Sequence, residues 1–252
     1  MRPQLASMRS GNPTLSAETF RKVRAAGGEE VMTIGGAVNK TAIALVLLVL
    51  AAAYTWNLGT ANPAMLGGLT MVGALGGLVV AMVTVFKQSW APITTPLYAV
   101  LEGLVLGGVS VLTEAQYPGI VAQAIFLTFG TLGALLIAYR TGLIQVTDRF
   151  RAGVFAATGG IMLFYLVGFA MSFFGASIPL VNTSSTFGIA FSVIVVGVAA
   201  LNLVLDFDFI ETGARAGAPK YMEWYAAFGL MVTLVWLYLE MLRLLSKIQR
   251  RD

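Results

Sequence analysis

Long apolar runs alternate with short polar breaks along the chain. A window of roughly 19 residues separates seven such runs, and most reach or approach the roughly 20 residues that a helix needs to span a bilayer. The runs are apolar on all sides, whereas strands of a membrane barrel would alternate with a period of two over about 10 residues. The predicted helices cover Thr41–Trp56, Ala64–Phe86, Pro92–Leu112, Gly119–Tyr139, Val154–Phe174, Phe187–Phe209 and Tyr225–Leu245. The pattern predicts an all-α membrane protein, a bundle of seven transmembrane helices.

Composition agrees with this pattern and sets the limits of the membrane domain. The chain is 58% hydrophobic and only 11% charged, too apolar to fold around one water-facing surface. The first 40 residues differ, because they carry six Lys or Arg and three Glu among Gly, Ser and Pro. We therefore expect a polar, partly disordered tail at 1–40, a transmembrane domain at 41–247 and a short basic tail at 248–252. A short interfacial helix at Ala17–Ala26 is the alternative within the first tail. The tail is too long and polar to be a signal peptide.

The basic residues predict the orientation in the membrane. Lys and Arg occur in the N-terminal tail, near Lys87, in 140–151 and in 215–220, whereas the three intervening breaks have none. The positive-inside rule then places the N-terminus in the cytoplasm. Basic residues after Arg243 conflict with seven crossings, and we favour seven full helices over a last segment that enters and returns. The net charge of +4 reflects helix ends that meet lipid phosphate, so we do not expect nucleic-acid binding.

Glycines indicate where helices approach each other closely. Gly73 and Gly77 are four residues apart in the second run, and Gly103 and Gly107 repeat this spacing in the third. Each pair lies on one face of a helix and allows a neighbouring backbone to approach. The spacing therefore predicts close packing rather than a phosphate-binding loop, which requires a preceding strand.

Four acids lie inside or at the ends of the apolar runs. A carboxylate at the centre of a membrane helix costs roughly 2.5 to 3.5 kcal/mol, so each acid needs a partner or a function. A protonated Glu102 hydrogen-bonded to a neighbouring helix would be purely structural, and Asp208, beside Glu211, could face water. Glu240 could pair with Arg243, because side chains three residues apart share a helix face.

Asp206 is the strongest functional candidate among these acids. Asn202 lies one turn earlier on the same face, so the two residues direct a polar stripe into the bundle. Two carboxylates brought together in a low dielectric cannot both ionise easily, so they would titrate as a unit and sense protons. When ionised, their oxygens suit Ca²⁺.

The absence of histidine and cysteine narrows the chemistry further. A serine hydrolase with a histidine base is excluded, and a metal centre would lack imidazole and thiolate ligands. We expect no enzyme, no metal site and no cofactor, with Ca²⁺ or H⁺ only as a transported ion.

Three segments together carry a resemblance to a known family. Pro96–Leu104, Leu205–Ile210 and Leu237–Glu240 occur in order within the third, sixth and seventh runs. They resemble the Bax inhibitor family (transmembrane Bax inhibitor motif), in its bacterial YccA-like branch. The resemblance implies a central last helix, a bacterial inner-membrane location and a pH-sensitive calcium leak. Its proton-sensing dyad falls on Asp206 and Glu240, where the family commonly has Asp at the second position.

Two hypotheses of function follow. The first is a pH-gated cation pathway in which Asp206 and Glu240 share a proton, with Glu102, Asn202 and Asp208 as pathway or accessory residues. The alternative is a membrane regulator without ion transport, which binds a quality-control protease or other membrane proteins through the N-terminal tail or loops.

Overall fold

The structure is a computed structural model that describes residues 30–173 and 185–250. The predicted disorder of the N-terminal tail before Glu30 lies outside the described residues, and so does the alternative interfacial helix at Ala17–Ala26. The last two residues of the predicted basic C-terminal tail also lie outside them.

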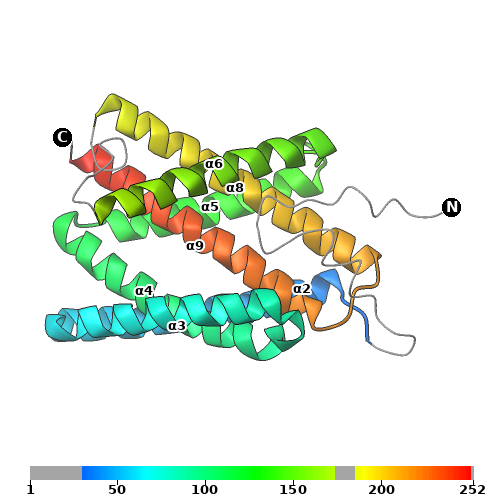
Figure 1. The fold of residues 1–252 in the computed structure, drawn as a ribbon, viewed down its shortest axis with the longest axis horizontal. Coiled ribbons are helices and arrows are strands. Elements are labelled where there is room, and N and C mark those ends of the chain that lie inside the picture. Colours follow the sequence, from blue (N-terminus) through cyan, green and yellow to red (C-terminus); the bar gives the residue numbers. More distant parts are fainter. Residues whose placement is uncertain (1–29, 174–184, 251–252) are drawn as a thin grey trace. The chain divides into compact units, whose positions relative to one another are not determined.

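Seven long helices account for most of the described chain (Figure 1). They are α2 (Ile34–Ala61), α3 (Leu66–Phe86), α4 (Ala91–Gln116), α5 (Ile120–Arg140), α6 (Asp148–Ser172), α8 (Thr186–Arg215) and α9 (Met222–Gln249), with short 3-10 turns η2 (Pro63–Met65) and η3 (Gln88–Trp90). All seven are long and apolar enough to cross a membrane, and each overlaps one predicted run. The prediction of an all-α membrane protein with seven helices is therefore confirmed.

Two helices, α2 and α6, begin before their apolar runs because a threonine side chain caps each of them. Helix α2 begins at Ile34 rather than Thr41, since the Thr33 hydroxyl accepts a hydrogen bond from the Gly36 backbone N–H at 2.9 Å. Thr147 caps α6 in the same way. Helix α8 continues through its acidic residues as far as Arg215.

Contacts divide the described chain into two compact units, and α8 and α9 each contribute to both. The first unit contains α2, α3, α4 and Asp208–Val232, which is the end of α8, the α8–α9 loop and the start of α9. The second unit contains α5, α6, α8 up to Phe207 and α9 from Thr233 onward.

Glycines allow the helices of the first unit to pack closely, with α4 lying against both α2 and α3 (Figure 1). A Cβ atom added at Gly73 of α3 would lie 2.6 Å from the Leu101 carbonyl oxygen of α4. One added at Gly107 of α4 would lie 2.5 Å from the Ala52 carbonyl oxygen of α2, and one at Gly103 would overlap the Leu48 carbonyl. These contacts confirm the predicted close packing at Gly73, Gly103 and Gly107, whereas a Cβ atom at Gly77 would make only ordinary contacts, the nearest at 3.4 Å.

Helix α9 is the most buried of the seven. Within its most apolar window 67% of the residues are buried, compared with 17–44% for the other helices. It therefore exposes less of its surface than any other helix of the described chain. Its central position stays a prediction.

We expect Gly103→Ala to destabilise the protein, because the new methyl group would push the α2 backbone away from α4. Overpacking of this kind costs about 1–3 kcal/mol. Gly68→Ala in α3 is the matched control, since a Cβ atom there meets nothing within 4 Å. Thermal unfolding in detergent measures both variants. Equal unfolding temperatures would contradict the packing role of Gly103.

Candidate functional site

Glu240 lies on α9 in the second unit and is only 2% exposed. Its Oε1 atom accepts a hydrogen bond from Arg243 Nη1 at 2.6 Å and another from the Tyr165 hydroxyl of α6 at 3.0 Å. The predicted pair with Arg243 is therefore confirmed, and Tyr165 adds a donor from a second helix. The Arg243 guanidinium balances the charge of Glu240 and so offsets part of the free-energy cost of burying this carboxylate.

Tyr165 connects the two charged side chains. Its hydroxyl accepts a hydrogen bond from Arg243 Nη1 at 2.6 Å while it donates to Glu240. The Arg243 guanidinium also lies 5.0 Å from the centre of the Tyr165 ring, in a cation–π contact. Phe191 of α8 packs edge-on against the same ring at 6.5 Å. Because Tyr165 is held by both polar and aromatic contacts, it fixes the position of the Glu240 carboxylate.

Asp206 and Asn202 form the predicted polar stripe on α8. Both are buried, with 0% and 1% of their surface exposed. Asn202 Nδ2 donates to the Thr158 hydroxyl of α6 at 2.8 Å and to the Val198 carbonyl at 2.9 Å. The stripe thus faces the interior of the second unit at Asn202, and Asp206 follows one turn later. The pairing of Asp206 with Glu240 stays a prediction.

Glu240 and Asn202 each have an oxygen atom that is buried and accepts no hydrogen bond from the described residues. These atoms are Glu240 Oε2 and Asn202 Oδ1. An unsatisfied buried acceptor costs about 1–3 kcal/mol. A proton would turn the carboxylate into a donor, and a hard cation would coordinate either oxygen directly. Each oxygen is therefore a candidate acceptor for a proton donor or a cation.

Lys247 is a second basic residue on the face of α9 that carries Glu240 and Arg243. It is 5% exposed, and its Nζ atom donates to the Gly188 carbonyl at 3.0 Å and to the Ser192 hydroxyl at 2.8 Å. The sequence indicated only a basic helix end here. The partners on α8 lie 59 and 55 residues away, so no local spacing reveals them.

Glu102 lies on α4 in the first unit and is half-buried. Among the described residues it accepts a hydrogen bond from Tyr98, one turn earlier on its own helix, rather than from a neighbouring helix. A Cβ atom at Gly77 of α3 would meet Glu102 Oε2 at 3.4 Å, so the carboxylate faces α3 where that helix has no side chain. The Tyr98 ring packs edge-on against Phe228 of α9 at 5.0 Å. The Glu102 carboxylate of α4 therefore lies against α3.

Asp208 differs from Asp206, although only one residue separates them in the sequence. It is partly exposed and belongs to the first unit, whereas Asp206 belongs to the second. Its neighbour Glu211 forms an ion pair with Arg215, whose side chain is 74% exposed. The side chain of Asp208 is thus partly accessible to solvent, whereas that of Asp206 is buried.

Glu223 is a buried acid that sequence reasoning missed. Its Oε1 atom accepts hydrogen bonds from the backbone N–H and the hydroxyl of Thr33, each at 3.0 Å, and lies 3.3 Å from Lys220 Nζ. Thr33 is 190 residues away, so only the fold brings the two together. An acid in the first turn of the last helix was the one available signal.

Seven apolar helices, two of which (α8 and α9) carry buried acids, define an integral membrane protein. The chain belongs to the Bax inhibitor 1 like family, because the sequence model of that family matches residues 12–250. Comparisons with characterised proteins and with solved structures returned no significant match. The family predicted from the three short segments is confirmed.

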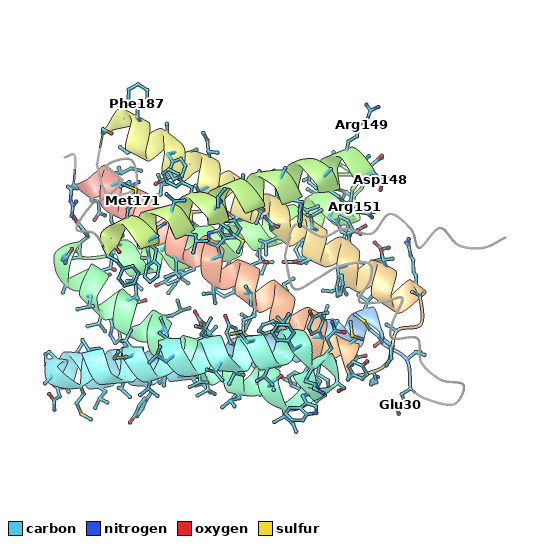
Figure 2. All side chains as sticks on the ribbon, in the orientation of Figure 1. Glu30, Asp148, Arg149, Arg151, Met171 and Phe187 are labelled. Carbon is cyan, nitrogen blue, oxygen red and sulfur yellow. The ribbon has the colours of Figure 1, made fainter. Side chains whose placement is uncertain are left out.

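We expect Arg243→Gln to destabilise the protein by about 1–3 kcal/mol, because Glu240 would stay buried without a counter-charge. The expected cost is kept below that of a fully buried pair because the Arg243 side chain is 38% exposed. Thermal unfolding in detergent measures the effect. Arg149→Gln is the control, since this arginine at the start of α6 is exposed and points away from the ribbon (Figure 2). Equal losses for the two variants would contradict the role of the ion pair.

Proposed function

We propose that this protein is a pH-sensitive cation leak, with Ca²⁺ as its cargo, gated by Asp206 and Glu240. The observation that supports this most strongly is that two buried acceptors of one unit, Glu240 Oε2 and Asn202 Oδ1, have no hydrogen-bond donor among the described residues. They belong to the same unit as the fully buried Asp206. Membership of the family, with the calcium leak that the resemblance implies, supports the same function.

The protonation state of the two acids would control the pathway. Ionised carboxylates attract a hard cation such as Ca²⁺, whereas protonated carboxyls are neutral and do not. Arg243 and Tyr165 hold one oxygen of Glu240, so the second is the one available to a proton or cation. Glu102, Asn202 and Asp208 would serve as accessory oxygen ligands along the path. The proposal involves no enzymatic step and no resident cofactor.

The proposed location is the bacterial inner membrane with the N-terminus in the cytoplasm. Its support is the distribution of basic residues, which places Lys87, 140–151 and 215–220 on the same side as the N-terminal tail. At the start of α6, Arg149 is exposed and Arg151 lies 3.4 Å from Asp148, so this end of the helix carries surface charge (Figure 2). Such a helix end suits contact with lipid phosphate.

Calcium flux into vesicles that contain the purified protein tests the proposal. Wild-type flux should change between about pH 5 and about pH 8. The double variant Asp206→Asn with Glu240→Gln should lose this pH dependence and carry roughly tenfold less flux, equal to about 1.4 kcal/mol. These amides keep hydrogen-bonding groups but carry no charge. Asp148→Asn, which changes an exposed acid, should leave flux unchanged.

Flux that is independent of pH, or that survives the double variant, would contradict the proposed gating. The alternative function, a regulator that binds a membrane protease or other membrane proteins, would then be favoured. In that case the cellular effect would be lost on removal of residues 1–29, whereas the leak hypothesis predicts that flux persists without them.

A further inference from the structure

The residues just before α2 are attached to the loop between α8 and α9. We call residues 30–33 the strap; Glu30 at its start is labelled in Figure 2. The Met32 N–H donates to the Ala218 carbonyl at 2.7 Å, and the Lys220 N–H donates to the Glu30 carbonyl at 2.9 Å. These bonds form an antiparallel bridge between Val31 and Pro219. The strap therefore pairs with the loop through its backbone.

Burial on one side strengthens this pairing. Met32 is 2% exposed, whereas its neighbour Val31 is 47% exposed, as expected for an extended segment with alternating faces. Ala218, the residue opposite, is also 2% exposed. Gly217, with φ of 66°, adopts the left-handed conformation that turns the chain out of α8 into this loop. The strap and the loop therefore each bury an apolar side chain where their backbones pair.

Glu223, in the first turn of α9, holds the strap in place through hydrogen bonds. Its Oε1 atom receives both the backbone N–H and the hydroxyl of Thr33 and lies near the Lys220 ammonium. The carboxylate stands at the N-terminal ends of both α2 and α9, where helix dipoles favour negative charge. Gly36 provides the space, since a Cβ atom there would overlap the carboxylate.

Other contacts hold the start of α9 independently of the strap. Lys40 of α2 lies 5.2 Å from the centre of the Trp224 ring, and the Thr95 hydroxyl of α4 donates to the Trp224 carbonyl at 3.1 Å. Tyr98 packs against Phe228 one turn further on. Release of the strap would therefore free the loop and the end of α8 while α9 stays in place.

We propose that the strap is a restraint on residues 208–215, the end of α8 that follows Asp206. Fastened by Glu223, it limits the movement of the α8–α9 loop. Detached, it lets this end of α8 open and increases the cation leak. The effect on leak rests on the proposed function, whereas the coupling between strap and α8 does not.

Hydrogen–deuterium exchange of the full chain in lipid vesicles tests the coupling. Gly36→Ala should displace the Glu223 carboxylate and Glu223→Ala should remove it. Both should speed exchange in 30–33 and 216–221 by roughly tenfold or more, with a smaller increase in 208–215. Gly35→Ala is the matched control, because a Cβ atom at this adjacent glycine meets nothing within 4 Å. If Glu223→Ala fails to fold, Gly36→Ala tests the same contact from α2.

Two exchange results would overturn the proposal. One is equal exchange in Gly36→Ala and Gly35→Ala, which would mean that Glu223 does not fasten the strap. The other is faster exchange in the strap and loop with 208–215 unchanged, which would mean that the strap does not restrain α8.

Calcium flux in the same vesicles separates this proposal from the proposed function. Gly36→Ala should leak several-fold faster than Gly35→Ala. A wild-type leak that depends on Asp206 and Glu240, yet is equal in the two glycine variants, would overturn the effect of the strap on leak alone. No wild-type leak, together with the expected exchange pattern, would refute the proposed function and support the coupling.

Discussion

The cost of burying carboxylates among apolar helices is the constraint on which the rest of this structure depends. For Glu240 and Glu223 this cost is offset in the same way, because several hydrogen-bond donors converge on the Oε1 atom of each. In both, Oε2 is buried and accepts no hydrogen bond from the described residues. Each acid is therefore stabilised by donors on other turns or helices, and losing a donor leaves a buried charge uncompensated.

The origin of the donors distinguishes the two acids. Those of Glu223 come from the strap and the α8–α9 loop, so its burial joins distant parts of the chain. Those of Glu240 come from Arg243 and Tyr165, in the unit that also contains the Asn202 and Asp206 stripe. The first arrangement suits a structural restraint. The second brings a charge-balanced acid into a unit with further buried oxygen atoms, which supports the proposed ion pathway.

The sequence predicts contacts between residues that are close in the chain, but not contacts between residues that are far apart in it. The helices were predictable because a bilayer demands long uninterrupted apolar runs, and the Glu240–Arg243 pair was predictable because three residues bring two side chains onto one helix face. Tyr165 lies 75 residues from Glu240, and Thr33 lies 190 from Glu223, so tertiary packing alone makes these contacts. The apolar runs also do not predict where α2 begins, because Thr33 caps the helix several residues before its apolar run.

We propose that Asp206 and Glu240 share a proton, and infrared titration of the carboxyl stretch tests this most directly. A shared proton makes the pair titrate as a unit. One protonated-carboxyl band should therefore disappear in either Asp206→Asn or Glu240→Gln and persist in Glu102→Gln. Two independent bands, each lost only with its own residue, would contradict it.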